Sequence, residues 1–481
     1  MLFVLGLTAA LVTIFVIALL AHEWWVKGEP LMSWRNFFLV GYLQFYCFSI
    51  VHWSLTQYPS PVYNPRGEMF GTLAATLVVF LGLWLLCYRW GFRWTWPARI
   101  MPQVRLPLTT SAFLICTVML AALSLLFTGI IRGGVGDSIL AQMRVPLMSA
   151  AGGCATVLVV SNPKNFLWWG LLISVMVLGL IVATIGTIDR RNFLSVLFVV
   201  AWVWYYISLR DQPKLRLAVK LGAVLVVFFL ALATYNAGRQ YKHFNAGFED
   251  RAAQFQRLAA EGPNLSSRNV IDGMFLQDTH ICTQAIMENY PSIFPYQPLH
   301  GILYYFGNPI PRVIWPSKPE AMGIILQRQL RVPANLGIGC IGHGWAEAAW
   351  IGVVYYAIGL GLICGIADRL ARMRADNPFF LISIGCSLGN VLGLARGETS
   401  LFMVLITVGF VVSTVVFWVV KSTFWAYMLV GKPVLIRGQP LDRPVDSWTG
   451  LPLEGESFDD ASEHEYPDYP DQSRYWPAPS A

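Results

Sequence analysis

Long apolar stretches alternate with short polar connections along most of the chain. A helix of about 20 apolar residues spans the hydrocarbon core of a bilayer, and the chain has about 11 stretches of this kind. They lie at residues 2 to 21, 36 to 53, 69 to 88, 107 to 129, 146 to 161, 166 to 188, 192 to 209, 217 to 236, 346 to 366, 378 to 395 and 400 to 420. The alternation typical of membrane β-barrels is absent from the sequence. The pattern predicts an all-α polytopic integral membrane protein.

Two polar segments interrupt this pattern and set the expected domain boundaries. Residues 1 to 236 hold spans 1 to 8, and residues 346 to 422 hold spans 9 to 11. Between them, residues 237 to 345 are too polar for a membrane interior and too rich in aromatic residues for a linker, so we expect one large folded loop domain. Residues 423 to 481 form a tail, and from Gly431 onward it has 4 basic and 10 acidic residues. This composition is typical of a disordered segment.

Composition identifies the solvent of this chain. Apolar residues make up 56% of it, charged residues 13%, and the mean hydropathy is +0.54. So much apolar surface cannot be buried in one water-soluble core, and we expect a lipid bilayer around the spans. The net charge of +7 comes from cations in short loops beside the spans, so we expect no nucleic-acid partner.

The distribution of Lys and Arg over the short loops predicts the orientation. One set of loops holds fourteen cations: Lys27, Arg35, Arg89, Arg93, Arg99, Arg105, Lys164, Arg210, Lys214, Arg216, Lys220, Arg369, Arg372 and Arg374. The opposite set holds six: Arg66, Arg132, Arg144, Arg190, Arg191 and Arg396. The richer set is cytoplasmic by the positive-inside rule. The N-terminus and the loop domain are then outside, and the tail is cytoplasmic.

The cysteines give little chemical information. Most of the eight lie inside apolar runs without metal-ligand spacing, which is typical of packing residues. Cys282 and Cys340 lie in the polar segment, where they could form a disulfide in an oxidising compartment.

Arginines at the predicted outer helix ends are the first candidate site. They share their side with the loop-domain residues Arg239 and Arg312. A guanidinium group is permanently charged and binds phosphate oxygens in a forked geometry, so a converging group suits a diphosphate-linked lipid. The alternative is that each one only reaches toward anionic headgroups.

Three motifs carry a resemblance to a known family. They are TIGTIDRRN at Thr184 to Asn192, NPIPRVIWPSKP at Asn308 to Pro319, and GHGWAEAAWIG at Gly342 to Gly352. In sequence and in order around the long loop they resemble the T-G-x-R, I-P-R-x-x-W-P-x-K-P and G-E-x-x-x-x-x-G stretches of O-antigen and oligosaccharide repeat-unit polymerases, the Wzy-type family. The resemblance is at the level of motifs over about a quarter of the chain, and the architecture matches over most of it.

The resemblance implies a function and its partners. Such polymerases transfer a glycan from an undecaprenyl-diphosphate carrier to the next carrier-linked repeat unit, at the outer face of the bacterial inner membrane. They are thought to need neither metal nor cofactor, and the sequence shows no acidic pair with cation spacing in a short outer loop. Flippase and chain-length regulator proteins are the expected protein partners.

The resemblance also suggests residue roles. Arg312 would hold a diphosphate or a glycan acid with help from Lys318 and Trp315, and Arg190 and Arg191 match the position of the family's arginine. Asp189 stands where the family usually has a small residue. The structural alternatives are that Arg312 and Trp315 only brace a proline-rich loop and that Asp189 and Arg191 only cap a helix end.

Transfer to a sugar hydroxyl needs a proton acceptor. His343 and Glu347 are four residues apart and would share one helix face, so we assign His343 as the base and Glu347 as its orienting group or a ligand of sugar hydroxyls. His280 and His300 are rivals for the base. Arg396 and Glu398 form a further substrate-binding pair, unless Glu398 merely neutralises Arg396.

Other classes fit less well. An O-antigen ligase shares architecture and donor but delivers the glycan to a lipid A core, and the motif wording favours the polymerase. A transporter of lipid-linked glycans would place ionisable groups near mid-membrane. A lipid-linked mannosyltransferase needs acids in the first large outer loop, where residues 54 to 68 offer Glu68 alone.

Overall fold

A computed structural model shows an all-helical chain. The structure describes residues 1–57, 60, 62–102, 104–130, 137–184, 190–210, 212–220, 222, 278–310, 312–332 and 336–434. Among these residues the only β pairing is an isolated bridge between Thr109 and Pro433. The helical class predicted from the hydrophobic pattern is therefore confirmed.

The described helices have the following bounds. They are α1 (Leu2–Trp25), α2 (Trp34–Tyr42), the π-helix η1 (Leu43–Phe48), α3 (Ser49–Thr56), α4 (Phe70–Arg93), α5 (Trp96–Ile100), α6 (Thr110–Ile130), α7 (Asp137–Ser161), α8 (Phe166–Thr184), α9 (Arg190–Trp204), the π-helix η2 (Tyr205–Leu209), α13 (Thr279–Asn289), α14 (His300–Gly307), α15 (Met322–Leu330), α16 (Gly339–Met373), α17 (Pro378–Gly385), α18 (Leu388–Gly393) and α19 (Thr399–Leu429).

Eight helices among the described residues are long and apolar enough to cross a membrane. They correspond to predicted spans 1 to 6, 9 and 11, which is the architecture of a polytopic membrane protein. Predicted spans 7 and 10 appear as shorter apolar helices, 194–209 and 378–393. The predicted span at 217 to 236 and the tail from 435 onward lie almost entirely outside the described residues.

Two predicted boundaries differ from the structure. Span 9 begins at Gly339 rather than at residue 346, so His343 lies within a long helix and not in a loop. Its glycines and histidine lower the local hydropathy, but their burial lets the helix continue. Span 10 is broken into α17 and α18 at Cys386 and Ser387. The broken pair is buried, so its free backbone groups meet protein rather than lipid.

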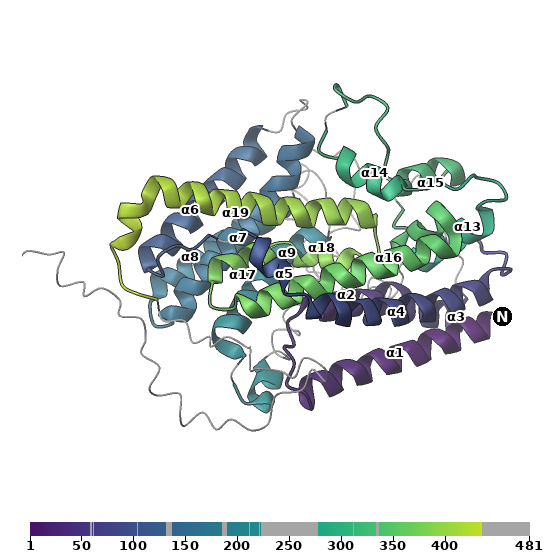
Figure 1. Cartoon of the computed structure of the whole chain (residues 1–481), viewed down its shortest axis with the longest axis horizontal. Coiled ribbons are helices and arrows are strands. Elements are labelled where there is room, and N and C mark those ends of the chain that lie inside the picture. The colour runs from purple at the N-terminus through teal and green to yellow at the C-terminus, as the bar shows by residue number, and fades with distance from the viewer. Residues whose placement is uncertain are drawn as a thin grey trace, which may run out of the picture. The chain divides into compact units, whose positions relative to one another are not determined.

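The described part of the predicted loop domain packs onto the spans. Every residue of α13 is buried, and the helix packs against α16 and η1. Its apolar side chains Cys282, Ile286 and Met287 belong to the same hydrophobic cluster as the spans. In Figure 1, α13 to α15 lie toward the end of the helix group where α1 begins. We call this end the loop face.

Polar contacts at the opposite end tie the first two spans to α16. The Asp368 carboxylate accepts hydrogen bonds from the backbone N–H groups of Trp34 and Arg35, at 2.7 and 3.0 Å, and from the Tyr88 hydroxyl at 3.0 Å. Arg35 also pairs with Glu23 at 3.1 Å. These contacts anchor α2 at its N-terminus, where a carboxylate is favourable.

Close backbone packing fixes α16 against α4. A methyl group at Gly361 would lie 3.1 Å from the Tyr88 nitrogen, and one at Gly365 would lie 2.7 Å from the Phe92 nitrogen. Small residues of this kind allow two membrane helices to approach closely. The part of α16 around Gly361 and Gly365 is therefore held rigidly against α4.

Candidate functional site

Helix α16 is kinked near its N-terminal end, directly after Glu347. Ala348 and Ala349 have non-helical dihedrals, with φ of −161° and 47°. The kink brings Gly344 against Gly352, and a methyl group on Gly344 would lie 2.7 Å from the Gly352 carbonyl carbon. Only glycine fits at so close a backbone approach. The glycines of the third motif therefore set the position of Glu347.

His343 lies between two carboxylates at the loop face. Its Nε2 atom is 3.5 Å from Oε1 of Glu347 and 3.3 Å from Oε1 of Glu398. Relative exposure is 0% for His343, 1% for Glu347 and 7% for Glu398. The pair expected at four-residue spacing is thus present, and it gains a partner more than 50 residues away in sequence. We call His343, Glu347, Glu398 and His300 the loop-face cluster.

Glu347 also caps a loop helix. Its Oε1 accepts hydrogen bonds from the Gly301 backbone N–H at 2.7 Å and from the Tyr356 hydroxyl at 2.8 Å. Its Oε2 accepts from the Tyr355 hydroxyl at 3.3 Å. Gly301 is in the first turn of α14, where unpaired N–H groups favour a carboxylate. Glu347 therefore has a structural role in addition to any chemical one.

Glu398 does the same for the next helix. It immediately precedes α19, and its Oε2 accepts a hydrogen bond from the Gly323 backbone N–H at 3.1 Å, in the first turn of α15. Burial raises the pKa of this carboxyl group to about 8. Oε1 of Glu398 faces the His343 imidazole, and the Arg396 guanidinium lies over the Phe45 ring at 5.6 Å.

His300 is the histidine that joins the cluster. Its ring centroid is 6.1 Å from that of His343, and burial lowers its pKa to about 4. The imidazole is therefore neutral at pH 7 and has a free lone pair. One ligand atom each from His300, His343 and Glu398 lies within 4.8 Å of the other two, an arrangement that can hold a metal ion. No spacing pattern in the sequence indicates this set, because three distant segments supply its residues.

The rival His280 has other partners. Its Nδ1 atom is 2.9 Å from the Ser49 hydroxyl oxygen, and its ring lies 5.4 Å from that of Trp53. These contacts join α13 to α3, so they give His280 a structural role.

The proline-rich motif is held mainly by its own contacts. Lys318 Nζ donates to the carbonyl oxygens of Asn308 and Ile310 at 3.0 and 2.8 Å, and partial burial lowers the pKa of this amine. The Trp315 ring packs against Gly307. The bracing role is therefore present for Lys318 and Trp315. Arg312 has a half-exposed side chain, whose NH1 donates to the Pro316 carbonyl oxygen at 3.3 Å.

The remaining predicted arginines are only partly described. Arg190 and Arg191 begin α9, but their side chains and the whole of Arg239 lie outside the described residues. The charge of Arg396 lowers the pKa of Asp278, whereas burial of this carboxyl group has the larger effect and raises it. Among the predicted site residues, the structure thus brings His343, Glu347 and Glu398 together.

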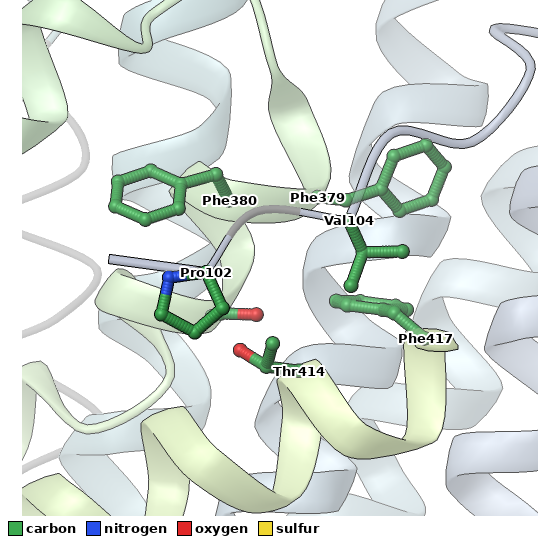
Figure 2. Close-up of a pocket in the computed structure, with 7 residues that line it drawn as sticks. Pro102, Val104, Phe379, Phe380, Thr414 and Phe417 are labelled. Atoms are coloured by element: carbon green, nitrogen blue, oxygen red, sulfur yellow. The ribbon is translucent and has the colours of Figure 1, made fainter. Parts of the chain in front are cut away.

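A small cavity near the opposite end has no comparable chemistry. Figure 2 shows it between a loop and two helices, with Pro102, Val104, Phe380 and Phe417 around it. Its volume of about 10 Å³ leaves room for about one water molecule. Its lining has no ionisable group, so it is not a glycan site.

The cysteines are free. Cys282 and Cys340 are both buried and unpaired, as are the other six. The disulfide considered from the sequence does not form in this structure.

Comparisons with known proteins add no identification. The chain matches no family model, no curated protein and no solved structure.

Proposed function

We propose that this chain is a membrane glycosyltransferase that polymerises oligosaccharide repeat units carried on a prenyl diphosphate at the outer face of a bacterial inner membrane. The observation that carries the proposal is the convergence of His343, Glu347 and Glu398. The sequence predicts each of the three as a site residue. Two of them lie in the third motif of the resemblance.

The chemistry of the cluster fits this reaction. The acceptor hydroxyl attacks the anomeric carbon of the donor glycan, the bond from that carbon to the diphosphate oxygen breaks, and the electron pair leaves with the diphosphate. In this proposal the hydroxyl proton passes to an imidazole or carboxylate group of the loop-face cluster. In this proposal Arg312, whose side chain is half-exposed, neutralises the charge of the leaving diphosphate.

The charge of the two ends supports the orientation that this reaction requires. The end opposite the loop face holds Lys27, Arg35, Arg372 and Arg374, which belong to the predicted cytoplasmic set. By the positive-inside rule the loop face is then periplasmic.

The products of the purified chain test the proposal. We expect reconstituted protein, supplied with prenyl-diphosphate-linked repeat units, to make a ladder of longer carrier-linked glycans on a gel. Transfer to a lipid A core without lengthening would instead identify a ligase. Movement of intact carrier across the vesicle membrane without new glycosidic bonds would identify a transporter.

Orientation has its own test. All eight native cysteines are buried, so a single cysteine placed at exposed residue Arg312 gives a low labelling background. An impermeant maleimide should label it in intact cells stripped of the outer membrane. Labelling only after the inner membrane is opened would overturn the orientation and the proposal with it.

A further inference from the structure

The loop-face cluster leaves an unusual number of buried polar atoms without partners. Both ring nitrogens of His300, both of His343 and Oε1 of Glu398 have no hydrogen-bond partner among the described residues. The contacts of His343 with the two carboxylates are at ion-pair distance but lack hydrogen-bond geometry. Buried polar atoms nearly always have a hydrogen-bond partner in folded proteins. We therefore expect a bound ligand to contact these atoms.

The unpartnered atoms are placed as metal ligands. We propose that His300, His343 and Glu398 bind one divalent transition-metal cation of the zinc class. The ligand atoms lie within 4.8 Å of one another. Tetrahedral zinc with nitrogen and oxygen ligands at about 2.0–2.2 Å separates neighbouring ligands by about 3.3 Å. The distance from His343 Nε2 to Glu398 Oε1 is 3.3 Å.

The donor set selects the class of cation. Calcium and magnesium bind almost entirely through oxygen, whereas two imidazoles and one carboxylate are typical of zinc and its neighbours. Three protein ligands leave a fourth position open, as in catalytic rather than structural zinc sites.

Surrounding contacts hold the ligands in place. The second carboxylate oxygen of Glu398 is fixed by the Gly323 N–H, so the first oxygen keeps its direction toward His343. The Glu347 carboxylate, 3.5 Å from His343 Nε2, is itself held by Gly301 and Tyr356. Such second interactions orient metal ligands and raise affinity. A bound cation would also compensate the two buried carboxylates.

The metal site goes beyond the proposed function and stands without it, but one consequence rests on that function. With the cation bound, His343 is a ligand and cannot be the base. An acceptor hydroxyl in the open position would then lose its proton to Glu347. The attacking oxygen bonds to the anomeric carbon, and the diphosphate departs with its electron pair. This differs from the metal-independent enzyme that the family resemblance implies.

Metal content of the full chain tests the site directly. The protein is purified in detergent with a tag that contains no histidine, stripped with a chelator, dialysed against zinc chloride and then against buffer. Mass spectrometry of the metal should give one zinc per chain, and cobalt in its place should give the intense visible absorption of a tetrahedral site. A chain that retains no zinc and shows no such cobalt spectrum overturns the proposal.

Matched variants locate the site. We expect His300→Ala and Glu398→Gln to weaken zinc binding more than about 100-fold, beyond the 10–100-fold typical of losing an outer partner. The control is His280→Ala, which removes an equally buried histidine bonded to Ser49 and should retain one zinc. Zinc retained by both ligand variants contradicts the assignment. If those variants fail to fold, the wild-type stoichiometry and cobalt spectrum still decide.

The glycan assay separates the two proposals. A chain that binds zinc at these residues but lengthens no glycan keeps the metal site and removes the proposed function. A chain that lengthens glycans at full rate and binds no zinc keeps the function and removes the metal site.

Discussion

Two different replacements of Glu347 together separate its proposed chemical role from its capping role. In Glu347→Ala, two fully buried donors, the Gly301 N–H and the Tyr356 hydroxyl, lose their acceptor. An unsatisfied buried donor costs about 1–3 kcal/mol, so the free energy of unfolding should fall by about 2–6 kcal/mol. That is a large part of the stability of a typical domain, about 5–15 kcal/mol. The alanine variant alone therefore cannot identify a catalytic role.

Glu347→Gln is the informative change. The carbamoyl oxygen can still accept from Gly301 and Tyr356, so the loss should be limited to the charge assistance of these bonds, about 1 kcal/mol. The amide cannot take up a proton, and loss of a general base typically costs about 10²–10⁴ in rate. We expect a folded protein whose rate of glycan lengthening per folded molecule is at least about 100-fold lower.

The chain offers a closely matched control in Glu288. This buried carboxylate at the loop face accepts from the backbone N–H groups of Arg66 and Gly67, at 2.9 and 3.2 Å, and from the Tyr63 hydroxyl at 2.9 Å. Glu288→Gln makes the same chemical change at a carboxylate that likewise accepts from backbone N–H groups and a tyrosine hydroxyl. Stability is followed by thermal unfolding in detergent. Equal rates for the two glutamine variants would show that Glu347 only holds α14.

Three further changes test other parts of the structure. Arg312→Ala removes a half-exposed side chain, so unfolding should change by no more than about 0.5 kcal/mol while gel sizing shows mainly single repeats; wild-type lengths would refute its role. Asp368→Ala leaves the Trp34 and Arg35 N–H groups without their acceptor and should lower the free energy of unfolding by about 2–6 kcal/mol. The rate of glycan lengthening per folded molecule should change little. Unchanged thermal unfolding would contradict the anchoring role of Asp368. Gly352→Ala places a methyl group against the Gly344 backbone and should lower the free energy of unfolding by about 1–3 kcal/mol through overpacking. The control Gly359→Ala, on the same helix, meets open space and should leave stability unchanged. Equal unfolding temperatures of the two variants would show that the kink is not tightly packed.

Long apolar stretches predict spans because the bilayer core requires a minimum apolar length of every helix that crosses it. This rule fails where protein rather than lipid surrounds the helix. Gly339 to Trp345 is too polar and glycine-rich to resemble a span, yet it is buried against α13 and continues α16. Likewise the break at Cys386 is invisible in an apolar stretch, because nothing in hydropathy reports a lost helical hydrogen bond.

The candidate site was only half visible from the sequence. The four-residue spacing of His343 and Glu347 predicts proximity because helix geometry is local. The approach of Glu398 and His300 depends on how α14, α15 and α19 pack, which no local pattern encodes. The sequence predicts a pair of Glu398 with its neighbour Arg396, and the structure also brings Oε1 of Glu398 to 3.3 Å from Nε2 of His343.

Capping and chemistry are coupled at the loop face through the same carboxylates. Glu347 and Glu398 each direct one oxygen to the first turn of a loop helix, α14 or α15, and each has an oxygen beside His343. Any movement of either loop helix must therefore move a carboxylate relative to the imidazole. Because α14 itself contributes His300 and leads into the Arg312 motif, substrate contact at that motif would be transmitted to the cluster through one short helix. The position of the loop and the geometry of the cluster then change together, which would give the proposed polymerase a physical means of limiting proton transfer to the substrate-bound state.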